Sequence, residues 1–202
     1  LSTYRENFKE LSEDEYSPLY NRALLAAYPP GSIYKMVTAI AAIDYGHYSP
    51  YHIITDQGLY TYYDSFQPKC YVWSRATGAT HGPIDMRQAI AHSCNYYFYE
   101  VGRVTYDTAQ KEVGYNPFDV IAKALGLGEP TGVELDEETG MRANAETKKE
   151  MYVNEDSGWY GADVLQAVIG QSLNKFTPLQ LACYTSALAN KGTRYEATLL
   201  SR

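Results

Sequence analysis

The sequence contains no run of about 20 consecutive apolar residues, which is the length that a membrane-spanning helix needs. Its first residues, from Leu1 to Arg5, also lack the pattern of a secretory signal. Basic residues are outnumbered, because 17 lysines and arginines stand against 24 aspartates and glutamates and the net charge is -7. A chain without a basic patch is a poor partner for nucleic acid. The composition is therefore typical of a globular domain that binds neither DNA nor RNA.

Cysteine is also scarce. The three cysteines are Cys70, Cys94 and Cys183, an odd number that cannot pair completely within one chain, and none belongs to a Cys-x-x-Cys pattern. We therefore expect free thiols, with no metal site and no cofactor. The four histidines, His81 among them, are scattered without a common spacing, and we expect them to be turn or surface residues.

The sequence does contain a long apolar segment, from Tyr28 to Gly46, that predicts a buried helix. Two prolines and Gly31 end the preceding segment, and residues 36–43 leave almost no polar face. The prediction is a helix from Ser32 to Tyr45 that is surrounded by protein on all sides.

Ser32 and Lys35 lie at the start of this helix, three residues apart and so on the same face. Burial of the lysine favours its neutral, proton-accepting form, and a hydroxyl beside such a base is a candidate nucleophile. The alternative is that Ser32 only caps the helix while Lys35 extends to water. For an isolated Ser-x-x-Lys pattern, which is common by chance, that alternative is preferred.

The rest of the chain predicts further helices joined by loops. Residues 48–83 are rich in glycine and proline and predict loops with one or two brief strands. Residues 84–105 have helical periodicity interrupted at 92–95, which predicts a turn between two helices whose polar side chains are free to point at another group. Residues 106–116 read as a polar connection, and Pro117 and Pro178 each follow a capping residue and open a helix.

Four short motifs occur along the chain: Tyr-Pro-Pro-Gly-Ser-Ile-Tyr-Lys at 28–35, His-Gly at 81–82, Ser-Cys-Asn at 93–95 and Thr-Pro-Leu-Gln-Leu-Ala at 177–182. In order and spacing they resemble the transpeptidase domain of class B penicillin-binding proteins. The resemblance covers nearly the whole chain. A Ser-x-x-Lys helix start followed some sixty residues later by Ser-x-Asn, in matching surroundings, is specific.

The resemblance implies the α+β fold of penicillin-binding transpeptidases and β-lactamases. We expect residues 1–202 to be the central, helix-rich part of one such domain, truncated at both ends. The segment should be mainly α with few short strands, and most of the sheet should lie outside it. The third family motif, Lys-Thr-Gly, is absent; in the family it lies on a strand after the point where this chain stops. Gly170-Gln171-Ser172 also replaces the usual Gly-Gln-Gly.

The implied function is that of a peptidoglycan D,D-transpeptidase. Ser32 would attack the D-Ala-D-Ala peptide of a stem, release D-alanine and pass the acyl group to an amine of a neighbouring stem. Penicillin mimics that peptide. By resemblance, Lys35 takes the Ser32 proton, Ser93 relays it to the leaving group, and Asn95 holds Lys35 and the substrate amide. The Ser32 backbone N–H would supply half of an oxyanion hole.

The resemblance also implies the partners and the location. The partners would be peptidoglycan stem peptides and β-lactams, and the location would be the extracytoplasmic face of the bacterial cytoplasmic membrane. The parent protein would be membrane-anchored and work with a glycosyltransferase. Without the Lys-Thr-Gly motif, we expect the 202 residues alone to be a poor or inactive enzyme that self-associates through the apolar face that the sheet would cover.

Three alternatives stay open. A β-lactamase needs a base that activates water, and no matching glutamate motif is present, so this enzyme is less favoured. A β-lactam sensor would share Ser32, Lys35, Ser93 and Asn95 and would be acylated without turning over. A structural or interaction fragment with a vestigial site is compatible with the missing motif.

Overall fold

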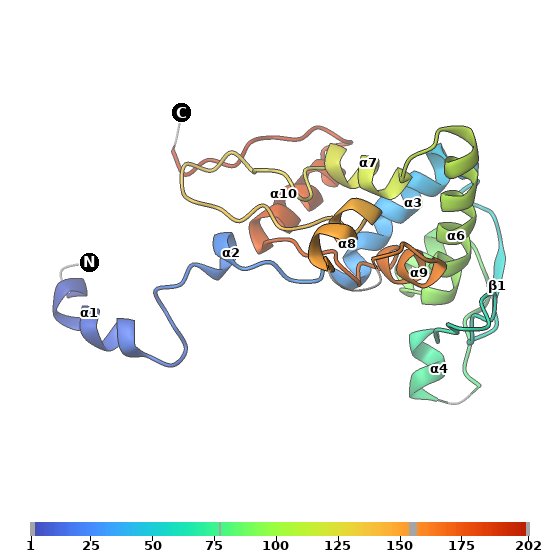
Figure 1. The fold of residues 1–202 in the computed structure, drawn as a ribbon, viewed down its shortest axis with the longest axis horizontal. Helices are drawn as coiled ribbons and strands as arrows, with labels where there is room; N and C mark the ends of the chain where they lie inside the picture. Colours follow the sequence, from blue (N-terminus) through green and yellow to red (C-terminus); the bar gives the residue numbers. More distant parts are fainter. Residues whose placement is uncertain (1–2, 77, 154–156, 201–202) are drawn as a thin grey trace.

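The structure is a computed structural model that describes residues 3–76, 78–153 and 157–200. These residues form a mainly α fold with one two-stranded sheet, as expected (Figure 1). The elements, in chain order, are α1 (Tyr4–Glu13), α2 (Arg22–Leu25), the 3-10 turn η1 (Gly31–Tyr34), α3 (Lys35–Asp44), β1 (Ile54–Asp56), α4 (Tyr71–Arg75), β2 (Gly82–Ile84), α5 (Met86–Ala91), α6 (Asn95–Glu112), α7 (Pro117–Ala124), α8 (Ala145–Met151), α9 (Gly161–Ala167) and α10 (Pro178–Ala189).

Helix α3 is the centre of the fold, because three separate apolar clusters meet on it. Val37 packs with residues of α7 and α10, Ala39 and Ala42 pack with α5 and α6, and Ala41 packs with α7 and α9. The small alanine side chains let the neighbouring helices approach closely. The helix predicted at the centre of the chain is therefore confirmed.

Two details of that prediction are wrong. The α-helix begins at Lys35 rather than Ser32, because residues 31–34 form a 3-10 turn. The helix is also not enclosed on all sides: Ile33 is 44 % exposed and Ile43 is 42 % exposed. With the partly buried Met36 and Ile40 they form a stripe along one face, at intervals of three or four residues. This stripe agrees with the expectation that the central helix exposes apolar surface.

Polar capping residues begin α7 and α10 at the positions predicted from the sequence. The Asn116 side chain accepts the Phe118 N–H just before Pro117, and Thr177 and Gln180 form a reciprocal capping box at the start of α10. Helix α6 is longer than predicted, because residues 106–112 continue it instead of forming a connection. The reason is that Thr105 and Ala109 are buried, so one face of this polar segment still packs.

Strands β1 and β2 pair antiparallel, with Ile54 opposite Ile84, and they connect the loop region of residues 48–83 to the start of α5.

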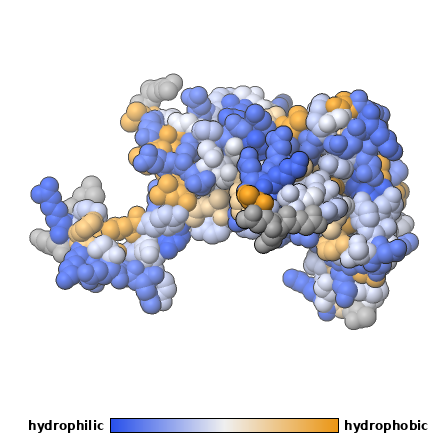
Figure 2. Space-filling view, in the orientation of Figure 1, coloured by the Kyte–Doolittle hydropathy of each residue, from blue (hydrophilic) through white to orange (hydrophobic). Residues whose placement is uncertain are grey.

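Helix α1 lies apart from the other helices, at the end of an extended segment (Figure 1). Figure 2 shows hydrophobic residues among hydrophilic ones on the visible face, including along the segment that joins α1 to the body. Among the described residues, no helix has both the length and the apolar character needed to cross a membrane.

The contact between α6 and α9 depends on a residue without a side chain. A Cβ atom on Gly102 would lie 2.7 Å from Val168 Cγ1, closer than carbon atoms tolerate. Glycine is thus required here for close packing of the two segments.

We expect Gly102→Ala to destabilise the fold by about 1–3 kcal/mol, because the added methyl group overpacks the core. Thermal unfolding of the full-length protein checks this. The double variant with Val168→Ala should recover part of the loss, since it removes the atoms that clash. A Gly102→Ala protein as stable as wild type would contradict the packing argument.

Candidate active site

Ser32 lies on η1, an exposed turn that a second turn holds in place. The Gly31 N–H donates to the Gly170 carbonyl oxygen at 2.9 Å, and a Cβ on Gly170 would lie 2.1 Å from the Gly31 oxygen. Both glycines have left-handed backbones, with φ of 59° and 74°. Ser172, where glycine is usual in the family it resembles, keeps a left-handed φ of 62°. The turn therefore tolerates serine at a strain cost of roughly 1–3 kcal/mol.

Lys35 begins α3 directly after this turn, and its side chain is almost completely buried, with 2 % exposure. Its amine donates three hydrogen bonds: to the Ser93 carbonyl oxygen at 2.8 Å, to Ser93 Oγ at 2.9 Å and to Asn95 Oδ1 at 2.6 Å. The Phe98 ring centroid lies 5.7 Å from the amine nitrogen. Burial lowers the pKa of Lys35 to about 8, although the nearby thiols Cys94 and Cys70 work against the shift.

Ser93 occupies the turn between α5 and α6 and links the lysine to the exposed serine. Its hydroxyl donates to Ser32 Oγ at 2.8 Å while accepting from the Lys35 amine. Its φ of 53° is unusual for a residue with a side chain. This conformation lets both its carbonyl and its hydroxyl bond to the same amine. Strained backbone of this kind is concentrated at functional sites.

The four residues predicted from the sequence are thus joined in one chain of hydrogen bonds, from Ser32 to Ser93, from Ser93 to Lys35 and from Lys35 to Asn95. Lys35 reaches Ser32 through the Ser93 hydroxyl, a relay that the three-residue spacing alone did not reveal. A chain of hydroxyl, hydroxyl and amine can carry a proton from the exposed oxygen to the buried nitrogen. The catalytic roles of these residues stay predictions.

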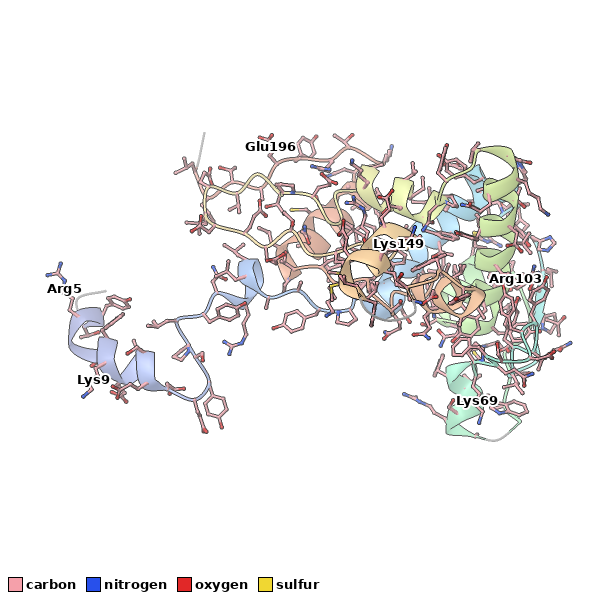
Figure 3. The ribbon with its side chains drawn as sticks, in the orientation of Figure 1. Arg5, Lys9, Lys69, Arg103, Lys149 and Glu196 are labelled. Atoms are coloured by element: carbon pink, nitrogen blue, oxygen red, sulfur yellow. The ribbon has the colours of Figure 1, made fainter. Side chains whose placement is uncertain are left out.

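Arg103 is a cation on the same helix as Asn95, and Figure 3 shows it on α6. Its guanidinium donates to Tyr60 Oη at 2.9 Å and to Glu100 Oε1 at 2.8 Å, and it lies 3.7 Å from the centroid of the Tyr62 ring. These contacts make Arg103 a structural cation rather than a group free to bind a substrate carboxylate.

Behind the Ser93–Asn95 turn lies a cluster that the sequence analysis missed. Asp56, Cys70, His81 and Cys94 each offer one ligand atom, and these atoms lie within 4.8 Å of one another. Asp56, Cys70 and Cys94 are buried. The expectation that His81 is an isolated turn or surface residue is wrong, because its Nδ1 lies 2.7 Å from Asp56 Oδ2. The cysteines are free thiols, as predicted. The four residues come from four segments, so no short motif marked them.

The electrostatics of this cluster favour the anionic forms of Cys70 and Asp56, whereas hydrogen bonding with Cys70 raises the pKa of Cys94. Hydrogen bonding with Cys94 lowers the pKa of Cys70 to about 6. Burial works to raise the pKa of Asp56, but hydrogen bonds from His81 and Gly58 outweigh it and the pKa falls. A thiolate, a carboxylate and an imidazole in one buried place are the donors that hold Zn²⁺ in proteins.

Comparison with known proteins agrees with the geometry. Residues 2–202 match the family model described as penicillin binding protein transpeptidase domain. The peptidoglycan D,D-transpeptidase MrdA of Haemophilus influenzae is 34 % identical over 187 residues, which cover 93 % of this chain and 27 % of that protein.

Two solved structures share the fold. The penicillin-binding protein PBP2 of Helicobacter pylori is 26 % identical, with a TM-score of 0.81 over 98 % of this chain and 35 % of that one. A chain of a peptidoglycan synthase complex that coordinates polymerization and crosslinking is 30 % identical, with a TM-score of 0.79 over 98 % of this chain and 31 % of that one. The chain spans about a quarter of the length of the MrdA relative. It belongs to the transpeptidase-domain family of the class B penicillin-binding proteins.

Proposed function

We propose that this chain carries the nucleophile and proton relay of a peptidoglycan D,D-transpeptidase. The observation that supports the proposal most is the hydrogen-bonded path from Ser32 through Ser93 to the buried Lys35 amine. The related proteins named as peptidoglycan D,D-transpeptidases support the substrate class. By the same likeness, the parent protein works at the extracytoplasmic face of the cytoplasmic membrane, with a glycosyltransferase partner.

The proposed reaction begins with Lys35 in its neutral form. The Ser32 hydroxyl then donates to Ser93 Oγ, and the Ser93 hydroxyl donates to the Lys35 amine. As Ser32 Oγ attacks the carbonyl carbon of the D-Ala-D-Ala peptide, its proton moves along this path and leaves Lys35 protonated. The C–N bond then breaks, and Ser93 returns the proton to the departing D-alanine amine.

The acyl-enzyme that results is an ester on Ser32. An amine from a neighbouring stem attacks it, passes its proton back along the same relay and restores the Ser32 hydroxyl. Asn95 fixes the direction of the lysine amine through its Oδ1 acceptor, and its side-chain N–H₂ is a donor suited to a substrate carbonyl. A β-lactam stops at the ester stage, because its leaving group stays attached.

A second, structural function is metal binding by Asp56, Cys70, His81 and Cys94. When two cysteine sulfurs bind one Zn²⁺ ion at about 2.3 Å with tetrahedral angles, the sulfurs lie about 3.8 Å apart. A cysteine sulfur and a histidine nitrogen on the same ion lie about 3.6 Å apart. The Cys70 and Cys94 sulfurs are 3.9 Å apart, and Cys70 Sγ is 3.6 Å from His81 Nδ1. The Asp56–His81 pair, at 2.7 Å, must open for an ion to enter. We propose a Zn²⁺ ion that fixes the Ser93–Asn95 turn through Cys94.

Acylation tests the nucleophile and the base. In the full-length protein, mass spectrometry should find penicillin attached to Ser32, and Ser32→Ala should abolish labelling. Lys35→Met should slow acylation by about 10²- to 10⁴-fold, because it removes the proton acceptor. The control Lys149→Met removes an exposed lysine of α8, labelled in Figure 3, and should label at the wild-type rate. Rapid labelling of Lys35→Met would contradict the proposed base. Slow deacylation, without transfer to an amine, would favour the sensor alternative.

The pH dependence of acylation follows from the buried lysine. The relay needs the neutral amine, so the rate should rise with pH while Lys35 loses its proton and level off above its pKa of about 8. Stopped-flow measurement of labelling across this range gives the apparent pKa. A rate that is flat over the same range, or that falls as pH rises, would rule out the neutral amine as the acceptor.

Cobalt(II) tests the metal site, since thiolate ligands give Co²⁺ an intense charge-transfer absorption. We expect the full-length protein to take up one Co²⁺ with this absorption and to release it to Zn²⁺. Cys70→Ser should weaken the band and the affinity. The control Cys183→Ser, on α10 and outside the cluster, should leave both unchanged. Absence of the band, or its loss in Cys183→Ser, would contradict the assignment.

A further inference from the structure

Tyr184 is a buried residue of α10 that contacts the turn carrying the nucleophile. Its side chain has 0 % exposure, and its hydroxyl donates to the Ile33 carbonyl oxygen at 2.9 Å. Ile33 directly follows Ser32, although Tyr184 lies 151 residues further along the chain. The hydroxyl therefore adds a hydrogen bond between α10 and η1 to the apolar contact that Tyr34 makes with α10.

The bonded carbonyl stands at the junction between two kinds of helix. In a regular α-helix the Ile33 carbonyl would accept the N–H of Val37, four residues later. Here α3 begins only at Lys35, and the Val37 N–H lies near the Tyr184 hydroxyl. Burial raises the pKa of Tyr184, and the nearby Val37 N–H works to lower it. One hydroxyl thus stands between a helical donor and its acceptor, and an inserted side chain is a recognised cause of local helix distortion.

The winding of η1 decides where the Ser32 side chain points. In a 3-10 helix residues three apart eclipse one another, whereas in an α-helix they differ by about 60° around the axis. Residues 31–34 are 3-10, and the Lys35 N–H donates to the Ser32 carbonyl. This winding places Ser32 in line with Lys35, where its oxygen meets the Ser93 hydroxyl at 2.8 Å.

We propose that the Tyr184 hydroxyl is a positioning group that keeps η1 in its 3-10 form and so holds Ser32 Oγ in line with Ser93. The proposal rests on the proposed function of Ser32 as nucleophile. Without the hydroxyl, the Ile33 carbonyl and the Val37 N–H can bond directly, and α3 extends backward through the turn. Ser32 then rotates away from Ser93, while the contacts of Lys35 with Ser93 and Asn95 stay in place.

The turn has other anchors, so the substitution need not unfold it. The Tyr34 ring stacks on the Phe176 ring with centroids 6.2 Å apart and planes 7° from parallel. Gly31 keeps its bond to the Gly170 carbonyl. Loss of the Tyr184 hydroxyl alone is thus expected to change the winding of the turn rather than its location.

The test is Tyr184→Phe in the full-length protein, with acylation by penicillin resolved into a binding constant and an acylation rate constant. We expect the acylation rate constant to fall by about 10- to 100-fold, the cost of a small misplacement of reacting atoms. The binding constant and the apparent pKa of the pH profile should not change, since neither depends on the orientation of Ser32. A crystal structure of the variant should show residues 31–37 rewound toward an α-helix.

Tyr97→Phe is the matched control. Tyr97 is equally buried, and its hydroxyl donates to the His52 carbonyl at 3.0 Å, away from η1. It should lose a similar amount of thermal stability and keep its acylation rate constant. Equal rate constants for Tyr184→Phe and wild type, or equal losses in the two variants, would overturn the positioning role. If wild type itself is not acylated at Ser32, the proposed function fails instead, and the variant's crystal structure still tests the winding of η1.

Discussion

The burial of one amine, that of Lys35, is the constraint on which the rest of the site depends. All three of its hydrogen bonds go to neutral oxygen atoms, so these bonds bring no opposite charge, and the nearby thiols Cys94 and Cys70 offset only part of the lost hydration. The chain must therefore place three acceptors around one nitrogen. Ser93, with its left-handed backbone, supplies two of these acceptors, and Asn95, the first residue of α6, supplies the third.

The apolar surroundings of α3 make this arrangement possible. Three clusters meet on its alanines and Val37, and they exclude water from the side of the helix that carries Lys35. The opposite stripe, from Ile33 to Ile43, stays partly exposed. Helix α3 thus has one face that is shielded from water, which lowers the pKa of Lys35, and another apolar face that stays partly exposed.

Sequence reasoning succeeded where local chemistry decides the structure. Proline after a capping residue correctly marked the starts of α7 and α10, and the small polar residues at 92–95 correctly marked a break between helices. The sequence also anticipated that Ser32 and Lys35 lie close together, although not that the Ser93 hydroxyl joins them. Prediction failed where distant residues decide. The 3-10 form of η1 depends on contacts from Gly170 and Tyr184, and no local pattern encodes them. The polar end of α6 was missed because a single buried residue per turn is enough to continue a helix.

The position of Cys94, between Ser93 and Asn95, joins two sites in three residues. Ser93 and Asn95 point to the lysine, and the thiol between them points to Asp56 and Cys70. Any movement of this buried thiol would therefore move Ser93 and Asn95 with it, because the three residues are consecutive.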